Sequence, residues 1–120
     1  MKLRILIIED NEQNMYMLTY LLESNNYEVV QSFSGREGIA LAKKSQPDAI
    51  LLDIQLPEMD GYSVARELRK NKNLNTTPII AVTSYAMTGD KEKAFEAGAT
   101  GYIEKPIDPD TFISQMEVFI

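Results

Sequence analysis

The stretch that decides the fold is DAILLDIQLPEMDG, residues 48–61, in which four consecutive apolar residues run directly into Asp53. A short, unbroken apolar run is typical of a strand that is buried on both faces, as in a parallel sheet. Pro57 then indicates a loop, and Asp60 has the side chain of a helix N-cap. The stretch therefore predicts a strand, a loop and a helix, with a carboxylate at the carboxyl end of the strand. The residues that this helix would turn inward are Val64, Ala65 and Leu68.

The same alternation continues on both sides of this stretch. Apolar segments predict further strands at residues 3–8, 27–33, 78–83 and 101–105. Apolar residues at helical spacing predict helices between and after them, whereas residues 71–77 have no apolar face and predict a loop. We expect Asp10 or Asn11 to cap the start of the first helix, and the Ser34-x-x-Glu37 capping box to start the second, which Pro47 ends. Gly98 should end the helix 91–97. Asp108 should cap the last helix, with Pro109 in its first position.

Five strands that alternate with five helices predict a single α/β domain over residues 1–120. Parallel neighbours need right-handed crossover connections, so the expected architecture is a doubly wound parallel sheet with helices on both faces. In such sheets, ligands bind beyond the carboxyl ends of the strands. The candidate functional residues are therefore those that directly end or follow a strand.

Composition narrows the possible functions. The net charge of -6 argues against nucleic acid as a direct partner. The chain has no cysteine and no histidine, which excludes a disulfide, a thiol nucleophile and an imidazole base. No apolar run reaches the roughly 18 residues that a membrane span needs. We expect a cytoplasmic protein, without membrane insertion, whose chemistry uses carboxylates, hydroxyls, amides and lysine.

Three acids are expected to converge. Glu9 and Asp10 follow the first strand, and Asp53 ends the third. Two carboxylates about 4 Å apart repel by roughly 4 kcal/mol at an effective dielectric of about 20, so the group favours binding of a cation. Mg²⁺ suits it because this ion takes one or two carboxylates and keeps several waters. Asp10 taken alone is equally well explained as a helix cap, so the magnesium hypothesis depends on all three acids.

Two more polar residues are expected at the same edge of the sheet. Thr83 ends the fourth strand and Lys105 ends the fifth. Each has a simpler explanation by itself, Thr83 as a cap and Lys105 as a loop residue before a proline. Together with the acids they predict a site for phosphoryl transfer, in which catalysis is mostly positioning and charge neutralisation. In this hypothesis Asp53 is the nucleophile and forms an aspartyl phosphate.

Four motifs, LIIEDN, LLDIQLPEMDG, AVTS and EKP, occur in this order at the ends of the predicted strands one, three, four and five. With them the sequence resembles the receiver domain of bacterial two-component response regulators over essentially its entire length. The resemblance implies a flavodoxin-like fold with strand order 2-1-3-4-5 and a cis Lys105-Pro106 bond. It also implies the following roles: Asp53 as phosphoacceptor, the carboxylates of Glu9, Asp10 and Asp53 with the backbone carbonyl of Gln55 as Mg²⁺ ligands, Thr83 as switch hydroxyl, Lys105 as phosphate-binding lysine, and Tyr102 as switch aromatic residue.

The resemblance further implies a signalling function. A phosphohistidine on a sensor histidine kinase or a histidine phosphotransfer protein would phosphorylate Asp53. The face of the fourth helix, fifth strand and fifth helix would then control a downstream protein, with the polar stretch 84–90 as its mobile part. The chain would lose the phosphoryl group by autodephosphorylation and would not be a turnover enzyme. Gln55 and Tyr85 would tune the lifetime of the phosphoryl group.

Two alternative functions remain open at the level of sequence. One is a Mg²⁺-dependent phosphohydrolase with an aspartate nucleophile, although such enzymes usually have a second acid where Gln55 stands. The other is a receiver-fold interaction module that works without phosphorylation, although such modules tend to lose an acid or the lysine. Both a stand-alone receiver of the cell-cycle or phosphorelay type and a piece of a hybrid kinase or longer regulator agree with the motifs.

Overall fold

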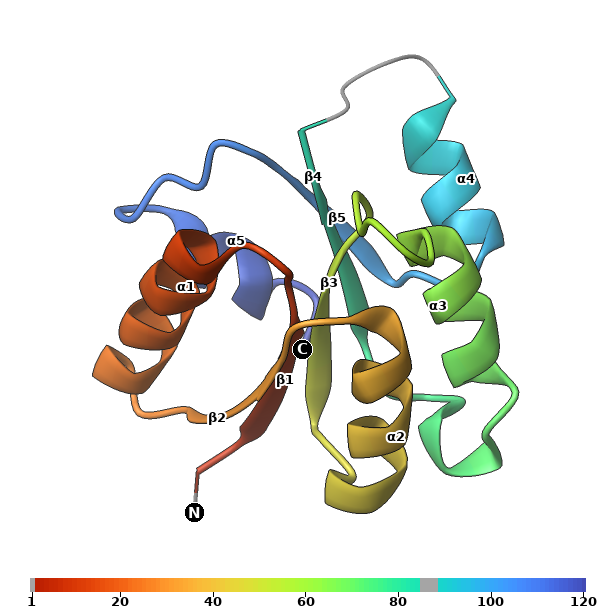
Figure 1. Ribbon diagram of the computed structural model, residues 1–120. Coiled ribbons are helices and arrows are strands. Elements are labelled where there is room, and N and C mark those ends of the chain that lie inside the picture. The colour runs from red at the N-terminus through yellow and green to blue at the C-terminus, as the bar shows by residue number, and fades with distance from the viewer. Residues whose placement is uncertain (1, 85–88) are drawn as a thin grey trace.

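The computed structural model describes residues 2–84 and 89–120 and contains a five-stranded parallel sheet (Figure 1). The strands lie in the order β2-β1-β3-β4-β5, which confirms the predicted doubly wound architecture and strand order. Each observed strand falls within its predicted range, with at most one residue fewer at either end. The strands are β1 (Arg4–Ile8), β2 (Glu28–Ser32), β3 (Ala49–Asp53), β4 (Ile79–Thr83) and β5 (Gly101–Glu104).

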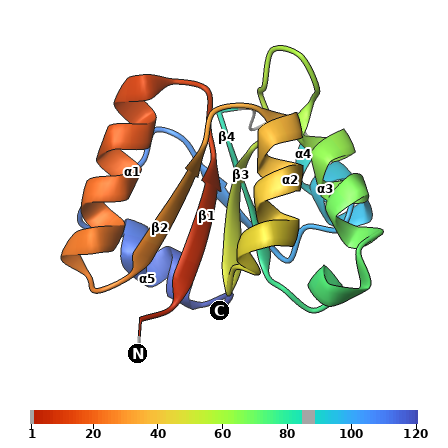
Figure 2. The same ribbon diagram turned by 60° about the horizontal axis from the view of Figure 1, so that its bottom comes forward.

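Helices cover both faces of the sheet (Figures 1 and 2). On one face lie α1 (Glu12–Ser24) and α5 (Phe112–Glu117), and on the other lie α2 (Gly35–Ser45), α3 (Gly61–Arg69) and α4 (Asp90–Glu96). Along β1, Ile5 and Ile7 pack in the cluster with α1 and α5, whereas Leu6 and Ile8 pack in the cluster with α2 and α3. Burial on both faces explains why the apolar runs in the sequence do not alternate with polar residues.

Side-chain caps begin the first three helices. Asn11, one of the two residues predicted for this role, accepts from the Asn14 N–H at 2.9 Å. Ser34 Oγ accepts from the Glu37 N–H at 3.1 Å, as the capping box predicts. The Glu37 carboxylate, however, accepts from the Phe33 N–H, one residue before the cap. At the other end of a helix, Gly98 follows α4 with a φ of 116°, as predicted for a left-handed helix end. The third helix begins with a bond from the Ser63 N–H to Asp60.

The predicted start of the last helix is wrong. Helix α5 begins at Phe112, with Thr111 as its N-cap, and not at Pro109. The Asp108 carboxylate accepts from the Asp110 N–H at 2.9 Å, and the Asp108 carbonyl accepts from the Thr111 N–H. An aspartate that bonds to the backbone two residues ahead forms a local turn, which competes with a helix start. Asp108 and Pro109 therefore belong to a turn that precedes the helix.

Residues 71–77 are also more ordered than the predicted loop. They contain a short 3-10 helix, η1 (Lys72–Leu74), capped by the Asn71 side chain. Leu74 is buried, and its carbonyl accepts from the Arg69 guanidinium at the end of α3. One apolar residue gives no periodicity, so the sequence pattern could not reveal this turn.

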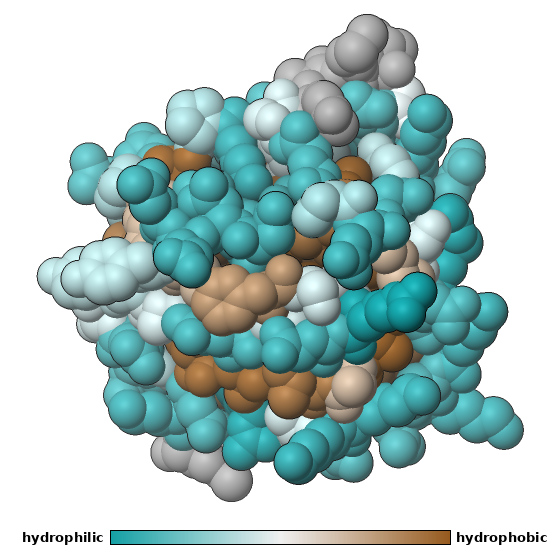
Figure 3. Space-filling model, in the orientation of Figure 1, coloured by the Kyte–Doolittle hydropathy of each residue, from teal (hydrophilic) through white to brown (hydrophobic). Residues whose placement is uncertain are grey.

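The molecular surface in Figure 3 is largely hydrophilic, with hydrophobic residues visible in small patches. Most large apolar side chains lie in the two clusters on either side of the sheet. Within residues 2–84 and 89–120, no helix has the length and apolar character needed to cross a membrane.

Candidate functional site

The register of the sheet places Glu9 beside Asp53. Ile8, the last residue of β1, pairs with Leu52 of β3, so the next residues of the two chains are neighbours. The hydrogen-bond ladder continues one step past β1, because the Glu9 N–H donates to Ser32 at 3.0 Å. We call the side of the sheet where the strands end the carboxyl edge. Two predicted site acids therefore meet there because of strand pairing alone.

Thr83 and Lys105 follow in order along the same edge. Asp53 pairs with Val82 of β4, and Thr83 is the next residue. The Lys105 N–H donates to the Thr83 carbonyl at 2.8 Å, which extends the pairing of β4 with β5 by one residue. Thr83 is buried and Lys105 is half-buried. The structure thus brings the predicted hydroxyl and ammonium to the edge that carries the acids.

The three acids form one cluster. Carboxylate oxygens of Glu9, Asp10 and Asp53 lie within 4.8 Å of one another, with Glu9 and Asp53 buried and Asp10 exposed. The N-cap of α1 is Asn11, so the Asp10 side chain is not needed to cap the helix. Hard oxygen donors with one exposed member are the ligand set that Mg²⁺ prefers, since the ion keeps several waters. These residues therefore fit the predicted metal ion.

A single ammonium group is shared by the two buried carboxylates. Lys105 Nζ lies 3.2 Å from Glu9 Oε1 and 3.3 Å from Asp53 Oδ2. The other oxygens bind backbone N–H groups: Glu9 Oε2 accepts from Asn11 at 3.1 Å, and Asp53 Oδ1 accepts from Gln55 at 2.9 Å. One ammonium opposite three carboxylates leaves an excess of negative charge at this edge.

The pKa of Glu9 reflects its buried position beside Asp53. Burial raises the pKa of Glu9 to about 7, and its contact with the Asp53 carboxylate adds to the rise. The Asn11 N–H and the Lys105 ammonium act in the opposite direction, but they do not outweigh burial. Binding of a cation at this site would favour ionisation of Glu9 beside Asp53.

The loop after β3 holds Asp53 close to helix α3. The Gly61 N–H donates to the Ile54 carbonyl at 3.0 Å. A Cβ atom at position 61 would lie 2.4 Å from the Ile54 Cα and 2.8 Å from the Asp53 carbonyl oxygen. Only glycine allows this approach without a shift of the backbone. This positioning role of Gly61 is not evident from the sequence alone.

Gln55 makes a contact that sequence reasoning missed. Its side-chain oxygen Oε1 accepts from the Ser84 N–H at 3.1 Å and from the Ser84 hydroxyl at 2.6 Å. The bond joins the loop after β3 to the loop after β4. No periodicity or capping signal links two polar loop residues 29 positions apart, so the sequence offered no means of finding it. The predicted role of the Gln55 backbone carbonyl stays a prediction.

Tyr102 lies on the side of the sheet that α4 covers. It pairs with Ala81 of β4, is half-buried, and packs against the small cluster of Ile54, Ala81 and Ala94. Burial raises the pKa of Tyr102, with a smaller contribution from nearby acids. The predicted cis Lys105-Pro106 bond is present. Tyr85, and with it residues 85–88 of the predicted mobile stretch, lie outside the described residues.

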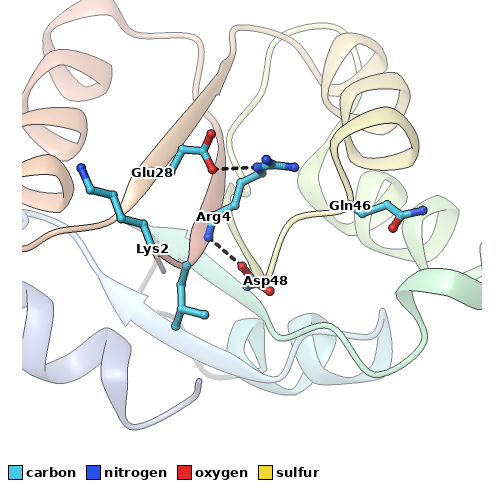
Figure 4. A pocket seen from close by; sticks show the side chains of 6 residues that line it. Lys2, Arg4, Glu28, Gln46 and Asp48 are labelled. Atoms are coloured by element: carbon cyan, nitrogen blue, oxygen red, sulfur yellow. Dashed lines mark hydrogen bonds and ion pairs between the residues drawn. The ribbon is translucent and has the colours of Figure 1, made fainter.

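A hollow of about 240 Å³ lies at the opposite end of the strands, which we call the amino edge (Figure 4). Here Arg4 Nε lies 2.9 Å from Glu28 Oε2, and the Arg4 N–H donates to Asp48 Oδ2 at 2.7 Å. Two basic side chains, Lys2 and Arg4, and two acids, Glu28 and Asp48, line this hollow, so this edge lacks the unbalanced charge of the carboxyl edge. None of the predicted site residues lines this hollow.

Comparison with known proteins agrees with this geometry. The family model described as "Response regulator receiver domain" matches residues 5–117. The polar-differentiation response regulator DivK of Brucella ovis is 41% identical over 116 residues, which cover 97% of this chain and 94% of the relative. DivK of Brucella anthropi is 40% identical with the same coverage.

Solved structures give the same result. The chemotaxis protein CheY4 of Vibrio cholerae superposes with a TM-score of 0.96 at 28% identity, and the alignment covers 100% of both chains. The receiver domain of sensor histidine kinase PA1611 from Pseudomonas aeruginosa PAO1 superposes with a TM-score of 0.90 at 34% identity, covering 99% of this chain and 98% of that one. Its structure has a magnesium ion coordinated in the active site cleft. By sequence, fold and site geometry, the chain belongs to the response regulator receiver domain family of two-component signalling.

Proposed function

We propose that the chain is a phosphorylation-activated switch that accepts a phosphoryl group on Asp53 in a Mg²⁺-dependent reaction. The observation that carries this proposal is the carboxyl edge, where three carboxylates lie within 4.8 Å of one another and two of them share the Lys105 ammonium. Membership of the receiver family supports it. The magnesium-bound receiver domain of PA1611 supports the choice of metal ion.

The transfer is a displacement at phosphorus. An Asp53 carboxylate oxygen forms the new P–O bond while the P–N bond to the donor histidine breaks. The electron pair of that bond returns to the imidazole nitrogen, and the proton on the other ring nitrogen stays, so a neutral imidazole leaves. These 120 residues contain no histidine, so the donor histidine lies outside this sequence, on a sensor histidine kinase or a histidine phosphotransfer protein. We expect this exchange in the cytoplasm, without membrane insertion or direct contact with nucleic acid.

The residues of the carboxyl edge have distinct roles in this proposal. The ligands for Mg²⁺ would be the carboxylates of Glu9, Asp10 and Asp53 and the backbone carbonyl of Gln55. Bound Mg²⁺ supplies charge neutralisation for these carboxylates and for the oxygens of the transferred group. Lys105 binds a phosphoryl oxygen through its ammonium group. The Gln55 N–H, which holds Asp53 Oδ1 at 2.9 Å, keeps the carboxylate oriented.

Phosphorylation replaces the single negative charge of the Asp53 carboxylate by a phosphoryl group that carries nearly two charges and three acceptor oxygens, which draws the Thr83 hydroxyl and Lys105 toward the new group. Tyr102 follows Thr83, and the face of α4, β5 and α5 changes its shape toward a downstream protein. Helix α4 suits this role because it has only seven residues, Ala94 is its buried residue, and its N-cap Gly89 makes no side-chain cap bond. A helix with so few buried contacts moves at low cost in free energy.

The chain returns to its resting form by losing the phosphoryl group to water, and we do not propose turnover of a phosphomonoester substrate. Gln55 supports this choice, because it stands where aspartate-nucleophile phosphohydrolases usually carry a second acid. Steady release of phosphate from a phosphomonoester, at many molecules per chain, would contradict it.

The proposal is tested by intact-mass spectrometry after incubation with acetyl phosphate, with and without Mg²⁺. We expect a gain of one phosphoryl group in the native chain only when Mg²⁺ is present, and no gain in Asp53→Asn. No gain under any condition, in a folded chain that binds Mg²⁺, would favour an interaction module that works without phosphorylation.

A further inference from the structure

Gln55 connects the phosphoacceptor to the loop that follows Thr83. Its backbone N–H binds Asp53 Oδ1 at 2.9 Å, while its side-chain oxygen binds both the N–H and the hydroxyl of Ser84, at 3.1 and 2.6 Å. Gln55 is half-buried and Ser84 is exposed. The residue therefore joins two loops that flank the site, through three hydrogen bonds.

A phosphoryl group on Asp53 needs hydrogen-bond donors for its three oxygens. The Lys105 ammonium and the Gln55 N–H already contact Asp53. Ser84 offers two more donors, its N–H and its hydroxyl. It lies two residues after Val82, which pairs with Asp53 in the sheet. Both Ser84 donors are bound to a neutral amide oxygen. Charged phosphoryl oxygens are stronger acceptors than a neutral amide, so exchange of partners is favoured.

We infer that the Gln55 side chain is a latch: it holds Ser84 in the unphosphorylated arrangement and releases it when the phosphoryl group takes over the Ser84 donors. This inference rests on the proposed function. It gives Gln55 a role in the equilibrium between the two arrangements, separate from any influence on the lifetime of the phosphoryl group. Loss of the latch therefore favours the phosphorylated arrangement, because only the resting one contains the bond.

The equilibrium can be measured apart from hydrolysis with beryllofluoride, which binds an aspartate non-covalently as a phosphoryl analogue. We would titrate it at saturating Mg²⁺ into the native chain, Gln55→Met and Gln55→Asn. Methionine keeps the length without the acceptor, and asparagine keeps the amide without the reach. Each variant should bind beryllofluoride roughly fivefold more tightly, the effect expected for one or two net hydrogen bonds. Gln31 lies on the outer strand β2, and its side-chain amide donates to Thr19 of α1 at 3.0 Å, so Gln31→Met is the matched control and should leave the affinity unchanged.

Unchanged or weaker binding by both folded Gln55 variants would overturn the latch. A glutamine with a merely structural role would lower the melting temperature and leave the affinity for beryllofluoride unchanged. The native chain supplies a second test by NMR: on addition of beryllofluoride and Mg²⁺, the proximity signals between the Gln55 side chain and Ser84 should disappear, and their persistence would contradict the inference. If the native chain binds no beryllofluoride at all, the proposed function fails instead.

Discussion

The two ends of strand β1 lie in contrasting electrostatic surroundings. At the amino edge, Arg4 and Glu28 form an ion pair whose side chains are 40% and 50% exposed. At the carboxyl edge, Lys105 and Glu9 form an ion pair whose side chains are 17% and 2% exposed. The first pair is solvated and balanced, so it contributes little to stability. The second is buried with acids in excess, an arrangement that costs free energy unless a further cation is bound.

This contrast distinguishes a structural charge cluster from a functional one. Both edges contain two acids close to a basic side chain, so residue types alone do not separate them. At the amino edge two basic side chains, Lys2 and Arg4, lie with two acids, Glu28 and Asp48, so the charges are balanced. At the carboxyl edge Glu9 and Asp53 share one ammonium with Asp10 nearby. Unbalanced, buried charge is therefore the feature that indicates function here.

The largest expected effect compares an aspartate from each edge. Asp53→Asn should abolish phosphorylation by acetyl phosphate, because the nucleophilic carboxylate is lost. Asp48→Asn should leave phosphorylation unchanged, since an asparagine oxygen still accepts the Arg4 N–H. Intact-mass spectrometry of the two variants measures both outcomes. Equal phosphorylation of native chain and Asp53→Asn would remove the functional distinction between the edges.

Removal of the single shared cation should have the next largest effect. Lys105→Met is expected to slow phosphorylation about 100-fold, the usual consequence of losing one group that stabilises the transition state. The same change should tighten Mg²⁺ binding, because the ammonium that competes for Glu9 and Asp53 is gone. Stopped-flow rates and calorimetric Mg²⁺ titrations separate these effects. A slower rate together with weaker Mg²⁺ binding would contradict the assigned role of Lys105.

A smaller effect concerns Tyr27, which precedes Glu28 near the amino edge and whose hydroxyl donates to the Glu117 carboxylate of α5. Burial, followed by this bond, raises the pKa of Tyr27 to about 12 from the ordinary value of 10. The folded chain therefore keeps this proton more tightly than the unfolded chain. Its stabilising contribution is fully present below pH 10 and is lost as the pH rises through about 12.

We accordingly expect Tyr27→Phe to lower the free energy of unfolding by about 1–2 kcal/mol at neutral pH. The difference from the native chain should shrink between pH 10 and pH 12, where the native chain loses the proton. Urea unfolding at several pH values measures it. A difference that grows with pH over this range would show that the sign of the linkage is wrong.

The smallest effect is expected at the solvated ion pair. Glu28→Gln should lower the free energy of unfolding by less than about 1 kcal/mol, because exposed pairs are screened by solvent and salt. Phosphorylation and Mg²⁺ binding should stay at native values. Urea unfolding and acetyl phosphate incubation provide the two readouts. Loss of phosphorylation in a folded Glu28→Gln variant would indicate coupling between the edges that the structure does not explain.

Most of the fold could be predicted because the sheet is buried on both faces. Segments such as 49–52 have no polar residue, so each strand was recognisable by itself and the alternation with helices implied a parallel sheet. The start of α5 could not be predicted in the same way. Asp108 and Pro109 are equally suited to a helix start and to a turn, and the hydrogen bond to Asp110 that decides between them is a property of the folded chain.

The site was predictable to the extent that it depends on strand ends. Glu9, Asp53, Thr83 and Lys105 directly end or follow strands, and register then brings them together. The contact between Gln55 and Ser84 joins two loops, and loop geometry has no periodic signature in a sequence. The contact of Gly61 with the strand end is similar, because a glycine after an aspartate first indicates a turn and does not reveal what it approaches.

The central claim is that the excess carboxylates of the carboxyl edge bind Mg²⁺ and that the balanced charges of the amino edge do not. The most direct measurement is an NMR titration with Mg²⁺ that follows backbone amides at both edges in the native chain and in Asp10→Asn. We predict one binding site, with shifts at Asp10, Asp53 and Gln55, unchanged amides at Arg4, Glu28 and Asp48, and roughly tenfold weaker binding in Asp10→Asn. Shifts centred on the amino edge, or native affinity in Asp10→Asn, would contradict the account.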